Sequence, residues 1–213
     1  APLAPYERIG DVPNVVFPCG LLHDPATDEI RMYYGAADSS ICLATARLDV
    51  TREDDIERLV ATTVERFGRI DCVISNAGAA SMTGALADTD PEDFDHDLAV
   101  HVRAPFLAMK YAAPAMVARR SGSFIHMSSI SGQRAGFNVF GYEVAKAALA
   151  HLTRCAALEL GEKGVRVNCI SPGPTRTGIF AKAGGLDPDV ADQRVDGVEA
   201  AFANLLPAVQ PMP

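Results

Sequence analysis

The sequence predicts an α/β fold, in which a β segment precedes a parallel sheet covered by helices. The chain has 213 residues, 48% of them apolar and 22% charged, which is the composition of a globular domain with its own core. Two apolar stretches, 30–36 and 41–47, flank a turn at 38–40 and predict two strands. From about residue 46 onward, apolar strands alternate with long amphipathic stretches, which predicts a parallel sheet with helices on its faces.

The elements of this second part can be assigned from their ends. The predicted strands end at Asp49, Ser75, Ser128 or Ser129, and Ile170. Thr51 is expected to cap the first helix, and Asp90 the second, with Pro91 at its first position.

The second helical stretch covers 91–120, where Pro105 and Pro114 are expected to kink or break it. A third helix is predicted from Tyr142 to Leu160, ended by glycine.

Charge and composition exclude several classes of partner. The net charge of −8 repels nucleic-acid backbones. No run approaches the roughly 20 apolar residues of a membrane helix, and no basic-then-apolar leader opens the chain. The five cysteines form no CxxC pair, which favours reduced thiols in the cytoplasm. We therefore expect a cytoplasmic protein that acts on a small molecule.

Three side chains form the first candidate site. Tyr142 and Lys146 are four residues apart on a predicted helix, so that both point the same way. An ammonium beside a phenol lowers the pKa of the phenol, which would let Tyr142 act as an acid or base near neutral pH. Ser129 ends the preceding strand, thirteen residues earlier.

The motifs from residue 46 to about 180 resemble the short-chain dehydrogenase/reductase family. The matching segments, in the family's order and spacing, are LDVT (48–51), SNAG (75–78), SSISG (128–132), YEVAK (142–146) and SPGPTRT (171–177). The resemblance implies an incomplete Rossmann-like doubly wound parallel sheet. It also implies a homodimer built through helices 91–120 and 142–160.

The resemblance also implies roles for single residues. Ser129 would orient a carbonyl or hydroxyl, Tyr142 would transfer a proton, and Lys146 would tune the tyrosine and hold the nicotinamide ribose. The cofactor-binding residues carried over from the family are Asp49 near the adenine, Asn76 near the cofactor ribose and Thr177 near the nicotinamide.

The family's glycine-rich phosphate turn has no counterpart here. Before residue 46 the only glycines are Gly10, Gly20 and Gly35, none of them in such a turn. Backbone amides at a helix N-terminus normally hold the pyrophosphate. We therefore expect NAD(P) to bind weakly or not at all, so that no cofactor is favoured.

The first part of the chain resembles a different family. Residues 7–46 are similar to a stretch of the β-propeller glycoside hydrolase/phosphorylase family that acts on mannosides. This divides the chain into a β segment at 1–45 and a truncated dehydrogenase-like domain at 46–213. We expect segment 30–47 to lie against the strand at 71–75 and cover its edge.

A histidine stands at the family's catalytic asparagine position. His101 is preceded one helical turn earlier by Asp97, and the two share a helix face. They could form an ion pair, or Asp97 could orient His101 to activate Ser129 as a nucleophile. A third possibility is a metal site formed by Asp97, His101 and His126.

These observations leave three functions open. The favoured one is a cofactor-independent hydrolase of activated esters or phosphoesters that uses Ser129, Tyr142 and Lys146 with His101. An NAD(P)-dependent oxidoreductase that interconverts a carbonyl and an alcohol is the alternative. A catalytically inactive remnant is the third.

Overall fold

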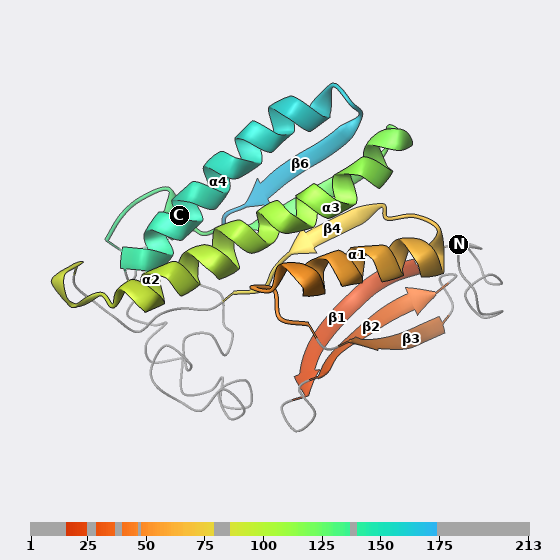
Figure 1. Ribbon diagram of the computed structural model, residues 1–213, viewed down its shortest axis with the longest axis horizontal. Helices are drawn as coiled ribbons and strands as arrows, with labels where there is room; N and C mark the ends of the chain where they lie inside the picture. The colour runs from red at the N-terminus through yellow and green to blue at the C-terminus, as the bar shows by residue number, and fades with distance from the viewer. Residues whose placement is uncertain are drawn as a thin grey trace, which may run out of the picture.

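The computed structural model contains two separate sheets and a layer of helices (Figure 1). It describes residues 48–78, 86–136 and 140–173, together with the backbone of the strands at 16–24, 29–36 and 40–46. The predicted Rossmann-like α/β fold with a parallel sheet is confirmed.

The parallel sheet has the strand order β4-β5-β6. Its strands are β4 (Cys72–Ser75), β5 (Gly122–Met127) and β6 (Val165–Ile170). The predicted ends at Ser75 and Ile170 are confirmed, and β5 ends one residue before Ser128. The predicted strand that ends at Asp49 is wrong, because the strand before it, β3, already ends at Ala46 and belongs to the other sheet.

The N-terminal sheet is antiparallel, with the order β1-β2-β3. Its strands are β1 (Val16–Asp24), β2 (Glu29–Ala36) and β3 (Ser40–Ala46), so the two predicted strands of this segment are confirmed. The expected pairing of this segment with the strand at 71–75 is wrong among the described strands. Short connections let these three strands pair with one another as antiparallel neighbours.

Helix α1 (Glu53–Phe67) begins after an N-cap at Arg52, whose side chain makes no capping bond. The predicted cap at Thr51 is wrong. Its N–H and hydroxyl both donate to the carboxylate of Asp49, at 2.9 and 2.7 Å. Hydrogen bonds to an ionised carboxylate are stronger than bonds between neutral groups. Thr51 therefore donates to Asp49 in the preceding turn and does not cap the helix.

The second helical stretch continues through a π-helical turn. After the short turn η2 (Leu86–Asp88), α2 (Pro91–Leu98) is capped by Asp90, as predicted, through a 2.8 Å bond from the N–H of Glu92. The π turn η3 (Ala99–Arg103) then leads into α3 (Ala104–Ala118). Pro105 lies in the first turn of α3 and Pro114 inside it.

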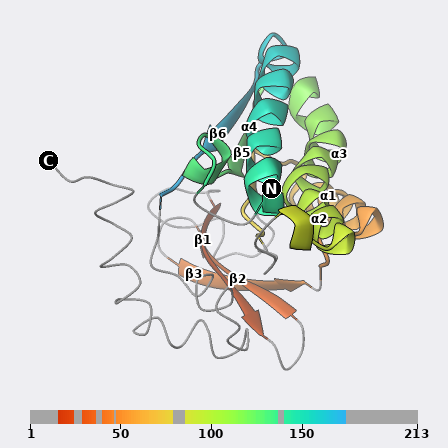
Figure 2. The same ribbon diagram turned by 90° about the vertical axis from the view of Figure 1, so that its left-hand side faces the viewer.

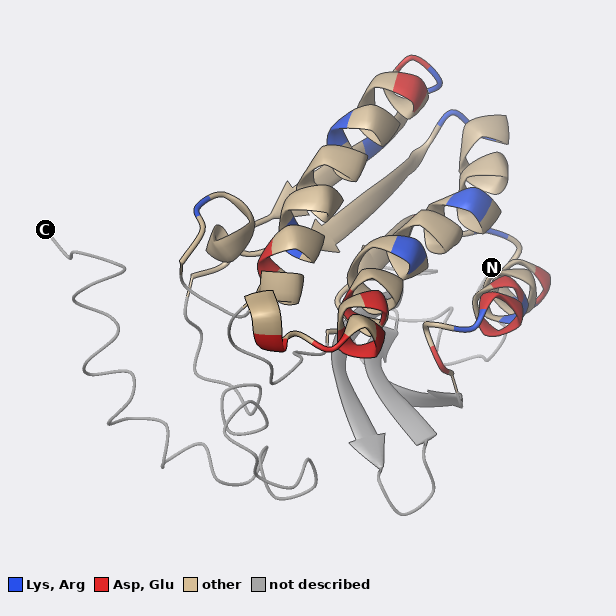
Figure 3. Cartoon of the chain, turned by 60° about the vertical axis from the view of Figure 1, so that its left-hand side comes forward, with Lys and Arg blue, Asp and Glu red and all other residues tan. Residues whose placement is uncertain are grey.

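The third predicted helix is confirmed as α4 (Phe140–Gly161), which follows the 3₁₀ turn η4 (Ile130–Gly132). Figure 2 shows α3 and α4 together on one side of the parallel sheet. The main core fills this interface; its buried members are Ile70, Met109, Ala112, Met116, Phe124, Leu160, Val165 and Val167. Acidic residues lie in the first turns of α1 and α2 (Figure 3), where the helix dipole favours negative charge.

His126 is a fully buried imidazole in this core. Its Nε2 lies 3.4 Å from the sulfur of Met109, and its ring stacks near Phe124. Burial lowers the pKa of His126 to about 4. In the unfolded chain the imidazole is protonated below its ordinary pKa of about 6.5, whereas in the folded chain it is protonated only below about 4. The free energy of unfolding therefore decreases as the pH falls from about 6.5 to about 4.

We predict that His126→Leu makes the free energy of unfolding less dependent on pH in the acid range. Between pH 7 and pH 4 the wild type should lose about 3 kcal/mol of this free energy through protonation of His126, and the variant should not. Urea unfolding at pH 7, 5 and 4 measures the difference. His151→Leu, on the exposed side of α4, is the matched control. An equal pH dependence in wild type and His126→Leu would contradict the assignment.

Candidate functional site

The site lies at the carboxyl edge of the parallel sheet. Strands β4, β5 and β6 run parallel, so the residues that follow them meet at this edge. Asn76 follows β4, Ser129 follows β5, and Tyr142 and Lys146 come from α4. The turn after β5 is tied to the end of β6, because the N–H of Ser128 donates to the carbonyl of Ile170 at 2.8 Å.

Ser129 is held by its local turn and by Tyr142. Its backbone is extended, and its hydroxyl accepts a 3.2 Å bond from the N–H of Ser131 as the N-cap of η4. The side chain of Ser129 also interacts with the phenol of Tyr142, which lowers the pKa of that phenol. The structure therefore brings together Ser129 and Tyr142, as the sequence predicted.

Tyr142 is half-buried, and its pKa is raised by burial. The negative charge of Asp97 raises it further, while the hydrogen bond from Ser129 opposes both effects. The expectation that the pKa of this phenol is lowered is wrong, because its net shift is upward. The ammonium lies over the ring face, 5.2 Å from its centroid, and burial of the phenol outweighs any effect of its charge.

Lys146 is a buried cation at the centre of the site. Its Nζ donates to the carbonyl of Met127 at 2.7 Å, and burial lowers its pKa to about 8. Its backbone carbonyl accepts a 2.8 Å bond from the hydroxyl of Ser128. A Cβ at Gly132 would lie 2.6 Å from the carbonyl carbon of Lys146, so only glycine permits this approach of α4 to η4.

Asp97 and His101 are both buried, and both lie beside Tyr142's helix. The rings of His101 and Tyr142 meet edge to face, with centroids 5.2 Å apart and planes at 89°. Cε1 of His101 lies 3.4 Å from the position of a Cβ on Gly78. An oxygen of Asp97 lies 2.7 Å from the corresponding position on Gly141, in the first turn of α4. His101 therefore contacts the tyrosine, whereas the hydrolase hypothesis pairs it with Ser129.

Other predicted site residues lie apart from this cluster or outside the described residues. The carboxylate of Asp49 is engaged by Thr51 before α1, and Asn76 is exposed after β4. Thr177 lies outside the described residues. His126 faces Met109 and Phe124 in the core.

The described residues include no group of three or more His, Cys, Asp and Glu side chains that could hold a metal ion. Among the helices of the described ranges, none combines the length and the apolar composition that crossing a bilayer requires.

Three contributors to the site were missed by sequence reasoning. The carbonyl of Met127 and the hydroxyl of Ser128 hold Lys146, and Gly141 makes room for Asp97. Ser128 is the first residue of the SSISG motif and Gly141 directly precedes YEVAK, and a small residue beside a catalytic one is a usable signal of close packing. The acceptor role of a backbone carbonyl leaves no trace in the sequence.

Comparison with known proteins gives consistent matches. Residues 24–198 match the family model described as enoyl-(acyl carrier protein) reductase. Momilactone A synthase of Oryza sativa subsp. japonica is 38% identical over 158 residues, covering 74% of this chain and 56% of that protein. L-fucose dehydrogenase of Oryctolagus cuniculus is 38% identical over 144 residues, covering 67% and 50%. The chain thus spans about half the length of the curated relatives it matches.

Solved structures agree with these matches. NAD+-bound xylitol dehydrogenase has a TM-score of 0.59 and 30% identity, covering 71% of this chain and 63% of that one. ElxO with NADP bound has a TM-score of 0.61 and 29% identity, covering 67% and 58%.

These findings correct two expectations. The interpretation as a cofactor-independent hydrolase is wrong, because the similar proteins are dehydrogenases and reductases. The expectation that no cofactor is favoured is also wrong, because similar structures carry NAD+ or NADP.

The family match covers most of the chain and includes every described residue of the Ser129, Tyr142 and Lys146 cluster. The chain belongs to the short-chain dehydrogenase/reductase family.

Proposed function

We propose that this chain carries the catalytic part of an NAD(P)-dependent oxidoreductase that interconverts a carbonyl and an alcohol on a small molecule. The observation that carries the proposal is the cluster of Ser129, Tyr142 and Lys146, with the ammonium of Lys146 5.2 Å from the centroid of the tyrosine ring. This cluster lies where the parallel strands end, the usual place for a ligand in such sheets. The names of the similar proteins include dehydrogenases and NAD(P)-bound structures.

Each residue of the cluster has a proposed role. The hydroxyl of Ser129 holds the oxygen of the substrate, and Tyr142 gives a proton to that oxygen or takes one from it. The positive charge of Lys146 stabilises the phenolate that forms when Tyr142 gives up its proton. The nicotinamide cofactor supplies or accepts the hydride.

The residues present fit the nicotinamide end of that cofactor. Lys146 is a buried ammonium with three donors, and Met127 is the acceptor that the described structure gives it. The hydroxyls of a ribose would satisfy the remaining donors. Asn76 lies exposed at the end of β4 and could contact the same ribose. Asp49 near the adenine and Thr177 near the nicotinamide remain proposals from the family resemblance.

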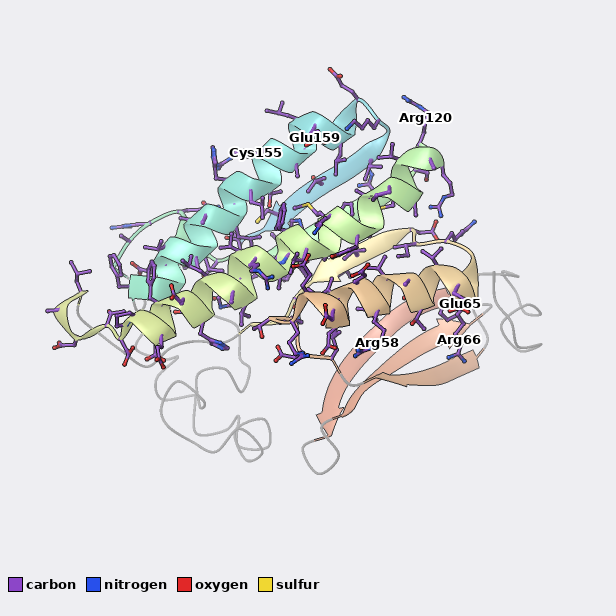
Figure 4. All side chains as sticks on the ribbon, in the orientation of Figure 1. Arg58, Glu65, Arg66, Arg120, Cys155 and Glu159 are labelled. Carbon is purple, nitrogen blue, oxygen red and sulfur yellow. The ribbon has the colours of Figure 1, made fainter. Side chains whose placement is uncertain are left out.

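A second structural proposal concerns the dimer. Helices α3 and α4 enclose a groove of about 460 Å³, and Phe106 in it is 49% exposed. Figure 4 shows Cys155 and Glu159 of this groove on α4. Its charged members Lys110 and Glu159 are already paired within the chain, with Glu53 at 2.7 Å and with Lys163 at 3.1 Å, so the apolar side chains of the lining are what a two-fold partner would cover. We infer a homodimer that buries this surface.

The first 45 residues are proposed to be a unit of different origin from residues 46–213. The antiparallel sheet β1-β2-β3 is separate from the parallel sheet, which supports this division. The resemblance of residues 7–46 to the β-propeller mannoside family supports it as well. A cytoplasmic location is proposed because the three described cysteines are free thiols.

We predict that NADPH or NADH raises the melting temperature and supports reduction of small aldehydes or ketones. Nucleotide at a hundred times Kd should add about 2.7 kcal/mol to stability. Tyr142→Phe and Ser129→Ala should each lower kcat by at least about a hundredfold, because proton transfer and substrate orientation are lost. Both should still bind the nucleotide.

Tyr111→Phe is the control, because that phenol bonds to Glu53 between α1 and α3. Nucleotide oxidation is followed by absorbance with a panel of small carbonyl compounds. If neither nucleotide shifts the melting temperature and no carbonyl is reduced, the proposed function fails.

We predict opposite pH profiles for the two directions of the reaction. Burial raises the pKa of Tyr142, so the phenol stays protonated at neutral pH and is ready to donate. Reduction should therefore be fastest at neutral pH. Oxidation of the alcohol needs the phenolate and should increase with pH, up to the range where Lys146 loses its charge, at about 8. Oxidation that is fastest below pH 7 would contradict this.

We predict that Phe106→Asp converts the dimer into a monomer, because a carboxylate would be buried in the apolar part of the groove. Light scattering at micromolar concentration measures the mass. Leu59→Asp is the matched control, since Leu59 has a similar exposure of 43% but lies on α1. A wild-type chain that is monomeric at this concentration would refute the dimer.

A further inference from the structure

Asp97 and His101 are buried, ionisable residues beside Tyr142 that the roles above do not use. Asp97 has no exposed surface and His101 is 1% exposed. Asp97 lies on α2 and His101 on η3, and both elements pack against α4. Burying a carboxylate and an imidazole costs free energy unless their polar atoms are hydrogen-bonded or paired with other charges.

The π turn places His101 against the site. The N–H of Ala104 bonds to the carbonyl of Ala99, five residues earlier. Pro105 has no N–H for the carbonyl of His101, and its ring would crowd that carbonyl in a regular helix. The wider π turn removes this conflict, and such turns are frequent at functional sites.

His101 lies between two parts of the site. One edge of its ring is near Gly78, in the turn after β4. Its ring also meets the ring of Tyr142 edge to face. A Cβ at position 78 would lie in van der Waals contact with the imidazole, at 3.4 Å, so the turn after β4 lies directly beside His101. The imidazole in turn restricts the movement of the phenol.

Asp97 adds a charge to this contact. Its carboxylate touches the first turn of α4 at Gly141, next to Tyr142. A helix N-terminus favours a carboxylate electrostatically, so the charge is well placed there. The same carboxylate acts on Tyr142 and on Lys146, in both cases holding the proton on.

We propose that Asp97 and His101 are positioning residues for Tyr142: the imidazole fixes the phenol ring, and the carboxylate places a negative charge behind it. The proposal rests on the proposed function and explains why reduction would be the favoured direction at neutral pH. A negative charge near the phenol opposes formation of the phenolate, so the tyrosine remains a proton donor. The groups that face Tyr142 are Asp97 from α2, His101 from η3, Ser129 from the β5–η4 turn and Lys146 from its own helix. Cys169 of β6 faces Lys146.

The test is a phenol titration of the protein without nucleotide. The near-ultraviolet absorbance of wild type minus that of Tyr142→Phe isolates the one tyrosine, and the same subtraction is made in an Asp97→Asn background. Asp97→Asn keeps the shape that fits against Gly141 and removes the charge. It should lower the apparent pKa of Tyr142 by roughly one unit. Asp95→Asn, on the exposed face of α2, is the matched control and should leave the titration unchanged.

The ring contact is tested by turnover. His101→Ala should lower kcat about tenfold, the loss expected for one edge-to-face contact, without weakening nucleotide binding. His101→Phe keeps the contact and should restore kcat. His96→Ala, on the exposed side of α2, is the control. If Asp97→Asn fails to fold, as judged by near-ultraviolet circular dichroism, Asp97→Ser replaces it.

The outcomes separate the two proposals. An unchanged Tyr142 titration in Asp97→Asn, or an equal shift in Asp95→Asn, overturns the role of Asp97. An unchanged kcat in His101→Ala overturns the role of His101. If the titration shifts as expected but the wild type reduces no carbonyl compound, the placement of the charge beside Tyr142 is supported and the proposed oxidoreductase function fails.

Discussion

The close approach of α4 to the turn after β5 is the contact on which the site depends. Gly132 has no side chain, which lets η4 lie directly against the backbone of Lys146. The hydroxyl of Ser128 then bonds to the carbonyl of Lys146, and the ammonium of the same residue reaches the carbonyl of Met127. These bonds fix the first half of α4 relative to β5, and so they place Tyr142 beside Ser129. A larger residue at position 132 would move the helix and separate the two hydroxyls.

Burial dominates the electrostatics of the site. It raises the pKa of Tyr142 and lowers that of Lys146 to about 8; in the core, apart from the site, it also lowers that of His126 to about 4. In each case the environment disfavours the charged form. The negative charge of Asp97 acts with burial on Tyr142 and against it on Lys146. Tyr142 and Lys146 therefore both keep their protons at neutral pH, which suits a proton donor.

The described part of the chain contains two sheets whose strands are connected differently along the sequence. The antiparallel strands β1, β2 and β3 pair through short connections. The strands β4, β5 and β6 are joined by helical crossovers, and the core between α3, α4 and the sheet closes them. Pairing strands that are close in sequence closes only short loops and therefore costs little conformational entropy. This explains why the N-terminal strands form their own sheet.

Local patterns in the sequence predicted where single strands and helices begin and end. The strand ends at Ser75 and Ile170, the cap at Asp90 and the helix from about residue 142 follow from apolar runs, capping chemistry and glycine. The spacing of Tyr142 and Lys146 placed both on one helix face, and the motif order identified Ser129 as their neighbour. The family resemblance over residues 46–180 also came from the sequence, and the family match confirms it.

Only the tertiary structure decided what these residues do to one another. The sequence predicted that Lys146 would lower the pKa of Tyr142, but the ammonium lies over the ring and the phenol is buried, so the pKa is raised. The sequence left open whether His101 forms an ion pair with Asp97, activates Ser129 or binds a metal, whereas the structure turns its ring to Tyr142. It placed Thr51 at a helix cap that Arg52 occupies. Spacing along a helix fixes which face a residue is on, whereas burial, ring orientation and the choice among hydrogen-bond partners depend on segments that are distant in the sequence.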